Sequence, residues 1–284
     1  MESERRKNAS EVSTVAELRA MASRMRRTAL TMTLRAGSNG AHVGPGLSII
    51  DICAVLYGRV MRLDPRNPLW DERDRFLLSK GHGSLGFYTA LAEAGFLTHD
   101  ELSTFETHET VLFGQPAMCV NKGIEISSGS LGHGLSIGIG VALAGRKAQL
   151  RYNTYVLMGD GECNEGAVWE AAMAASHFKL DKLTAIIDAN GLQSDGPCST
   201  IMDMGSHEAK WQSFGWETRS TDGHDVEALL NAFTSPRTEP NKPLAIVATT
   251  VKGNGVSFME NNIEWHHSRL SQAQYDAALQ ELTD

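Results

Sequence analysis

Two polar side chains stand at the ends of two apolar runs in this sequence. Asp160 follows residues 155–158 within the triplet Gly-Asp-Gly, and Asn190 follows residues 183–187, 30 positions after Asp160. A carboxylate and an amide oxygen are hard ligands that suit Mg²⁺ better than Zn²⁺. Since Mg²⁺ seldom occupies a cage made of protein alone, the pair predicts a magnesium site that also holds a phosphate-bearing ligand. The alternative is a turn aspartate and a loop-capping asparagine, both of which are common.

Three glycine-rich loops each carry a histidine, at His42, His82 and His133. Imidazole titrates near neutral pH and is therefore suited to moving protons at hydroxyl and carbonyl oxygens. The alternative is a histidine that serves only the structure of its loop. The catalytic interpretation requires that the fold bring the three loops together.

The runs 155–158 and 183–187 have the length and apolar character of strands buried on both faces. The alanine-rich segment 170–178 between them predicts the crossover helix of a βαβ unit. Further strands are predicted at 75–79 and 244–250, helices at 15–36, 48–59, 87–94 and 135–144, a long glycine-rich loop at 37–46, and a helix end with a turn at 211–216.

Strands that alternate with helices predict an α/β fold with a doubly wound, mostly parallel sheet. In open α/β sheets, ligands bind beyond the carboxyl ends of the strands. Asp160 and Asn190 are both expected at that edge of the sheet.

Composition narrows the classes of protein that this chain can represent. Its 284 residues contain no Pro/Ser-rich linker, which predicts a single domain over residues 1–284 with a disordered polar tail at 1–10. A net charge of −8 disfavours nucleic acid as a partner. The N-terminus lacks the apolar core of a signal peptide, and no run of about 18 apolar residues is present, which disfavours secretion and membrane spanning. Four scattered cysteines without Cys-x-x-Cys spacing indicate reduced thiols in a cytoplasmic protein.

Two short motifs point to other enzyme classes. Residues 81–86 match the Gly-x-Gly-x-x-Gly fingerprint of a Rossmann dehydrogenase, but no second strand ending in an acidic residue is evident, and His82 would crowd the pyrophosphate. Residues 134–138 match the Gly-x-Ser-x-Gly elbow of a serine hydrolase, which requires a strand directly before it, whereas 129–134 is predicted to be a loop. Both interpretations are disfavoured.

Longer stretches carry a resemblance to a known family. The text GDGECNEGAVWEAAMAASHFKL, followed by IIDANGLQSDG, is similar to transketolases, and especially to the amino-terminal half of two-gene transketolases. DRFLLSKGHG, ISSGSLGHGLSIGIG and VKGNGVSFMENN extend the similarity over nearly the whole chain, as far as His266. The resemblance implies that thiamine diphosphate and Mg²⁺ are the cofactors. Asp160 and Asn190 would be side-chain ligands of Mg²⁺, and Leu192 would supply a backbone carbonyl.

The resemblance also implies which groups hold the diphosphate. Backbone groups near Gly159 and Gly161, and from Gly129 to Leu131, would do so together with Mg²⁺. The family more often has Asn or Asp at the position of Ala189. Because Ala189 precedes the ligand position, the metal site is expected to persist.

By the same resemblance, the reaction is transfer of a two-carbon ketol unit from a ketose donor to an aldehyde acceptor, with the cofactor as electron sink. His42 and His82 match active-site histidines of the family. A third functional histidine is expected at His266 or His267, with His266 preferred, although the text reads Trp-His-His where the family has Trp-His-Gly.

Two expected substrate-binding positions depart from the family. Gln115 stands where the family has the histidine of Gly-His-Pro, and a glutamine amide forms hydrogen bonds but transfers no protons. Recognition of the ketose donor is therefore expected to differ. His133 stands where the family commonly has Gln. It either compensates for the missing histidine or fills the same hydrogen-bonding position, and the second interpretation is favoured.

The chain matches only the first of two homologous domains of a full-length transketolase. In the family, the carboxylate that activates the aminopyrimidine ring belongs to the second domain. The chain is therefore expected to be one subunit of a split enzyme, in a heterotetramer with a partner chain that carries the pyrimidine-binding domain. Glu165 and Glu170 match acidic positions toward that partner, with Glu165 counted among the cofactor-site residues. They are equally well explained as carboxylates at the start of a helix.

Three alternatives remain open. The chain can belong to another thiamine diphosphate-dependent carboligase or synthase with a different donor, or it can be a non-catalytic relative that kept the fold. An NAD-dependent Rossmann dehydrogenase is the remote option. The identity of donor and acceptor is left undetermined.

Overall fold

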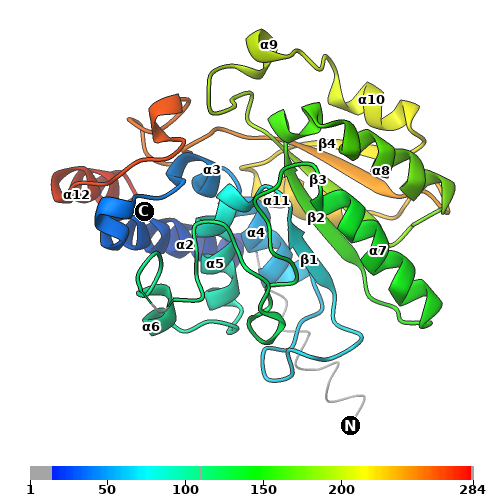
Figure 1. The fold of residues 1–284 in the computed structure, drawn as a ribbon, viewed down its shortest axis with the longest axis horizontal. Coiled ribbons are helices and arrows are strands. Elements are labelled where there is room, and N and C mark those ends of the chain that lie inside the picture. Colours follow the sequence, from blue (N-terminus) through cyan, green and yellow to red (C-terminus); the bar gives the residue numbers. More distant parts are fainter. Residues whose placement is uncertain (1–14, 109, 283–284) are drawn as a thin grey trace.

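The computed structural model describes residues 15–108 and 110–282, and its core is a single five-stranded parallel sheet (Figure 1). The strands lie in the order β1-β2-β3-β5-β4, and every neighbouring pair is parallel. Their bounds are β1 Arg75–Leu78, β2 Thr154–Gly159, β3 Leu183–Ala189, β4 Glu217–Asp222 and β5 Leu244–Thr249. The prediction of a doubly wound, parallel α/β fold is confirmed. The expected tail at 1–10 lies outside the described residues.

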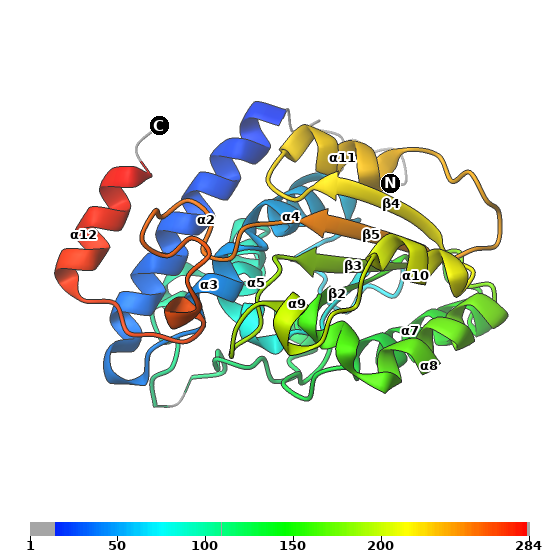
Figure 2. The same ribbon diagram turned by 90° about the horizontal axis from the view of Figure 1, so that it is seen from above.

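The central strands are apolar because helices cover both faces of the sheet. Along β2, Tyr155 and Leu157 pack into one core, whereas Val156 and Met158 pack into the other. One face is covered by α2 (Val15–Ala36), α4 (Ile50–Val55), α5 (Ser84–Glu93) and α11 (Val226–Thr234), and the other by α7 (Gly134–Lys147), α8 (Gly166–His177) and α10 (His207–Ser213) (Figure 2).

Strand β4 is the strand that the sequence pattern did not predict. Its text, Glu-Thr-Arg-Ser-Thr-Asp, holds no apolar residue, because β4 pairs only with β5 at the edge of the sheet. An edge strand needs less apolar surface than a central one. Helices α11 and α12 (Gln272–Glu281) were also not predicted.

The predicted long loop at 37–46 is partly wrong. It contains the short helix α3, Val43–Leu47, with Pro45 in its first turn. A proline is tolerated there because the first N–H groups of a helix have no partner within it. The predicted helix 48–59 is divided into α4 and a π-helical turn, η2 (Leu56–Val60).

The remaining short elements connect the layers. They are η1 Gly37–Asn39, η3 Gly81–Gly83, α6 His99–Leu102, η4 Val120–Lys122, η5 Gly161–Asn164, α9 Cys198–Ile201 and η6 Ile263–Trp265. One helical stretch, Val43–Val60, is long and apolar enough by composition to cross a membrane, but 83% of it is buried inside the fold. In this structure the stretch forms part of the hydrophobic core.

Candidate active site

The carboxyl ends of the strands direct polar residues to one edge of the sheet. β1 runs into Lys80 and His82, β2 into Asp160, β3 into Asn190, and β5 into Lys252. Gly159 and Asp188 are paired across β2 and β3, so the segments that follow them leave the sheet side by side. The parallel topology thus brings together residues that are far apart in sequence.

Four histidines form a cluster at this edge. The His42 ring centroid lies 5.9 Å from that of His82, 5.6 Å from that of His266 and 4.5 Å from that of His267. The His82 and His266 centroids are 5.3 Å apart. The three histidines expected to act in catalysis therefore lie together, and His267 lies against His42.

Three histidines of the cluster, His42, His82 and His266, are held in their neutral form. Burial, with the nearby His267 and Lys252, lowers the pKa of His42 to about 4. Burial and the positive charge of Lys252 lower the pKa of His266 to about 3, and burial holds the pKa of His82 well below its usual value. A neutral imidazole has one N–H donor and one acceptor nitrogen, so such a ring can donate a hydrogen bond to one oxygen and, where its second nitrogen is free, take a proton from another.

Asp160 and Asn190 lie at the same edge of the sheet, where a hydrogen bond joins Asp160 to the residue after Asn190. Asp160 Oδ2 accepts a hydrogen bond from the N–H of Gly191 at 2.6 Å, and Oδ1 accepts one from the N–H of Gly161 at 2.8 Å. Asn190 Oδ1 accepts from the N–H of Leu192 at 3.0 Å. Within residues 15–108 and 110–282, no group of three or more His, Cys, Asp or Glu side chains is arranged to hold a metal ion. A metal here would need the amide and carbonyl oxygens beside Asp160, and oxygens of a ligand.

Lys252 is a site residue that sequence reasoning missed. Its side chain is 1% exposed, and its Nζ donates to the carbonyl oxygens of Leu192 (3.2 Å) and Gln193 (3.0 Å) and lies 2.8 Å from Nδ1 of His266. Burial and the positive charge of Lys80 lower its pKa to about 8. It joins the segment that follows Asn190 to the histidine cluster. The available signal was a lysine directly after an apolar strand and before Gly253, where burial is unusual for lysine.

Unpartnered polar groups converge beside Gly81. Gln115 Oε1, Ser128 Oγ and His42 Nδ1 are buried without a hydrogen-bond partner in the described part of the chain. A Cβ built on Gly81 would overlap Gln115 Oε1 and lie 2.7 Å from Ser128 Oγ. Only glycine leaves this space, which is bordered by hydrogen-bonding atoms and adjoins His82. Buried polar atoms without partners are rare in proteins, so Gln115 and Ser128 are candidates to hydrogen-bond a ligand beside Gly81.

The loop from Gly129 to Gly134 is fixed by a buried carboxylate. Glu162 Oε1 accepts from the N–H of Gly132 at 2.8 Å and from the Ser79 hydroxyl, while Oε2 accepts from the N–H of Gly159 at 3.1 Å. This one side chain therefore sets the spacing between two of the glycine segments that were expected to hold a diphosphate. Sequence reasoning assigned it no role.

The other expected residues of this region lie nearer the surface. His133 is exposed at the start of α7, and its Nδ1 lies 3.0 Å from the Leu131 carbonyl oxygen. Glu165 is exposed before α8 and contacts the same loop, because a Cβ on Gly132 would lie 2.6 Å from Glu165 Cβ. Neither side chain makes a ring or polar contact with His42 or His82 that would join it to the histidine cluster in the described residues.

The two short motifs of other enzyme classes have structural explanations. A Cβ on Gly86 would lie 2.6 Å from the Gly46 carbonyl oxygen, so this glycine permits α3 to pack closely on α5 rather than admitting a pyrophosphate. Ser136 is exposed in the first turn of α7, and a loop precedes it instead of a strand.

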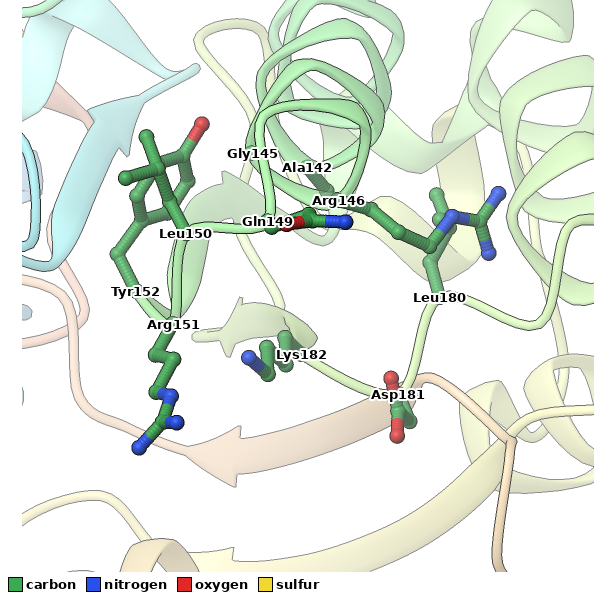
Figure 3. A pocket seen from close by; sticks show the side chains of 10 residues that line it. All are labelled: Ala142, Gly145, Arg146, Gln149, Leu150, Arg151, Tyr152, Leu180, Asp181 and Lys182. Atoms are coloured by element: carbon green, nitrogen blue, oxygen red, sulfur yellow. The ribbon is translucent and has the colours of Figure 1, made fainter.

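A cavity of about 260 Å³ lies at the opposite end of the sheet, where α7 ends and β2 begins (Figure 3). Its lining includes Arg146, Gln149, Arg151 and Lys182, but the charged ends of Arg146 and Arg151 spread apart. Arg146 Nη1 is already bonded to the Phe178 carbonyl at 2.5 Å. The polar groups that line this cavity do not converge, in contrast to those of the histidine edge.

Comparison with known proteins gives consistent matches over most of the chain. Residues 19–283 match the family model described as the transketolase thiamine diphosphate binding domain. The chain is 38% identical over 268 residues to one of the subunits of an apulose-4-phosphate transketolase from Phocaeicola vulgatus, covering 94% of each chain. It is 41% identical over 241 residues to a 6-deoxy-6-sulfo-D-fructose transketolase subunit of a Clostridium species, covering 85% of this chain and 88% of that one.

Solved structures agree with these sequence matches. The transketolase of Campylobacter jejuni is similar with a TM-score of 0.86 and 28% identity, covering 93% of this chain and 42% of that chain. The transketolase of Leishmania mexicana has the same TM-score and identity, with 96% and 42% covered. This chain therefore spans about 42% of the length of these solved transketolases.

Proposed function

Because this chain belongs to the transketolase family, in the part that forms its thiamine diphosphate binding domain, we propose that it is the cofactor-anchoring subunit of a split transketolase. With a second subunit it transfers a two-carbon ketol unit from a ketose donor to an aldehyde acceptor. The observation that carries the proposal is that Asp160, Asn190 and the cluster of His42, His82 and His266 follow strands or loops at one edge of the sheet, where Lys252 links the Leu192 carbonyl to His266.

The residues present fit thiamine diphosphate and Mg²⁺. Asp160, the Asn190 amide oxygen and the Leu192 carbonyl would hold the metal, and their hard oxygen character suits Mg²⁺. Lys252 places a positive charge beside the same carbonyl and would balance a diphosphate. The N–H groups of Gly159 and Gly161 donate to Glu162 and Asp160 in this structure, so backbone groups beside these two glycines and in the loop from Gly129 to Leu131 would approach the phosphate oxygens.

When bound, thiamine diphosphate supplies the carbon nucleophile and the electron sink for cleavage of a carbon–carbon bond. His42, His82 and His266 would then serve the oxygens of the substrate. Neutral His42 and His82 can each donate a hydrogen bond to a carbonyl oxygen and take a proton from a hydroxyl, whereas His266, whose Nδ1 lies 2.8 Å from Lys252 Nζ, can donate from Nε2 to a substrate oxygen. His42 Nδ1, which is buried without a partner among the described residues, is free for that purpose.

Exposed apolar side chains on segments next to the site residues support the need for a partner. Phe113 and Met118 flank Gln115 in the sequence, Ile137 follows the loop that ends at Gly134, and the Met202 carbonyl bonds Asn164, with exposed fractions from 41% to 62%. Exposed apolar groups near a functional site are typical of protein interfaces. We propose that a subunit carrying the pyrimidine-binding domain covers these side chains in a heterotetramer, with Glu165 and Glu170 facing it. All four cysteines are free, which is consistent with the cytoplasm as the site of assembly.

The assembled protein should be stabilised by thiamine diphosphate and Mg²⁺ only when both are present, because each completes the other's ligands. At 100 times the dissociation constant, the expected gain is about 2.7 kcal/mol, measured by thermal unfolding of the chain purified with its partner. NAD⁺ in place of thiamine diphosphate is the control. Stabilisation by NAD⁺ alone would favour a dehydrogenase, and no response to either cofactor would favour a non-catalytic relative.

Gln115 is proposed to select the ketose donor. Gln115→His should change kcat/KM by about tenfold for donors whose hydroxyl meets this side chain, the effect of one hydrogen bond of about 1–1.5 kcal/mol. The ranking of a panel of ketose donors should therefore differ from that of the wild type. Val111→His, in an exposed position four residues before Gln115, is the matched control. An unchanged ranking in Gln115→His contradicts the proposal and leaves His133 as the remaining candidate.

A further inference from the structure

A buried ion pair lies next to Asn190, one of the proposed metal ligands. Lys80 follows β1 and is 1% exposed, and Asp188 lies in β3 and is 0% exposed. Asp188 is within an apolar strand, and its neighbours in the sheet are Gly159 and Ala248. We propose that this pair is a positioning device that fixes the orientation of the Asn190 amide. The inference rests on the proposed function of the site.

Asp188 is saturated with donors. Its Oδ2 accepts from Lys80 Nζ, from Ser48 Oγ at 2.7 Å and from Asn190 Nδ2 at 2.9 Å, and its Oδ1 accepts from Thr250 Oγ1. A carboxylate offers about four lone-pair sites. These donors therefore hold the carboxylate in a single orientation. They also join the segments after β1, β3 and β5 to the loop before α4.

The hydrogen bond to Asn190 decides which way its amide faces. Only the nitrogen of an amide can donate to a carboxylate, so Nδ2 must face Asp188. Oδ1 then faces Leu192, whose N–H donates to it at 3.0 Å, and it keeps a second lone pair for a cation. With the amide reversed, Nδ2 would point at the cation, and an amide nitrogen that carries two hydrogens is not a ligand for Mg²⁺. Asp188 thus selects the orientation that binds a metal.

Stability alone does not account for this pair. Burying two charges carries a desolvation cost that their attraction often fails to exceed, and replacing a buried ion pair with apolar residues of similar size is commonly neutral or stabilising. Orienting a metal ligand is a better-supported role for such a pair. Loss of a group that orients a metal ligand costs about 10–100-fold in metal affinity. The contact between Asp188 and Asn190 gives Lys80 and Asp188 this role.

The test compares metal affinity with folding in the full chain. The double variant Lys80→Met with Asp188→Leu removes both charges while keeping buried volume, and Thr250→Val removes one donor to Asp188. Thr154→Val is the matched control, because Thr154 is fully buried and its hydroxyl has no partner among the described residues. Binding of Mn²⁺ in the presence of inorganic pyrophosphate is measured by electron paramagnetic resonance, and folding by circular dichroism and thermal unfolding.

We expect the double variant to lose about 10–100-fold in Mn²⁺ affinity while remaining folded, Thr250→Val to lose about tenfold, and Thr154→Val to match the wild type. A folded double variant with wild-type affinity overturns the inference. If the double variant does not fold, wild-type affinity in Thr250→Val overturns it in the same way. A wild-type chain that binds no Mn²⁺ with pyrophosphate overturns the proposed function of the site itself, which distinguishes the two failures.

Discussion

Asp160→Ala should abolish retention of thiamine diphosphate and Mg²⁺ by the assembled enzyme. Asp160 is the one carboxylate in the proposed ligand set, and it also holds the N–H of Gly191, next to Asn190, at 2.6 Å. Loss of a group that merely orients a metal ligand costs about 10–100-fold in affinity. Loss of the charged ligand itself should cost more, because the cation would keep only neutral protein oxygens. The measurement is the cofactor and magnesium content of the protein after gel filtration.

A matched control separates this effect from a general loss of negative charge. Asp181→Ala removes an exposed aspartate at the opposite end of the sheet, beside the cavity of Figure 3, and should leave cofactor content unchanged. Full occupancy of the site in Asp160→Ala would refute the assignment of this residue to the metal.

His82→Ala and His42→Ala should each lower kcat by about 10²–10⁴-fold, the usual contribution of a positioned acid or base. Because neither imidazole contacts Asp160 or Asn190 within the described residues, cofactor content should stay at the wild-type level. Steady-state ketol transfer by the assembled enzyme, with cofactor content measured on the same samples, checks both parts. His177→Ala, at the exposed end of α8, is the control and should have no effect.

The pH dependence of the reaction follows from the same cluster. Since the pKa of His42 is lowered to about 4, its neutral form predominates at every pH above that value. Protonation of His42 should therefore not reduce the rate between pH 5 and 7, where a histidine of ordinary pKa would titrate. A loss of rate centred near pH 6.5 that disappears in His42→Ala would contradict the neutral state assigned here.

The parts of the site that the sequence predicted depend on topology. Asp160 and Asn190 follow apolar runs, and parallel strands place whatever follows them at one edge. This rule requires no knowledge of side-chain contacts. It also predicts that His82, which follows β1, lies at the same edge of the sheet. The existence of the four apolar strands was also predictable, because a strand buried on both faces is marked by its own residues.

What the sequence did not predict depends on contacts between distant residues. Lysines are ordinarily expected at the surface, so the burial of Lys80 and Lys252 was not predicted. Their burial is explained by their partners, Asp188 for Lys80 and the Leu192 carbonyl for Lys252. The approach of Gln115 and Ser128 to Gly81 joins three separate loops. Strand β4 carries no apolar signal because the sheet ends there.

The strand order has a consequence for how the chain is made. β5 lies between β3 and β4, although it is the last strand in the sequence. A ribosome that synthesises the protein from its amino end therefore releases β3 and β4 before the strand that must separate them. Until residues 244–249 emerge, the apolar edge of β3 has no neighbour, and β4 has nothing to pair with. Lys252 and His266 emerge later still. Folding of the sheet and of its ligand site must therefore wait until the chain has been synthesised past residue 266, and during that interval the exposed strand edge is a target for chaperones.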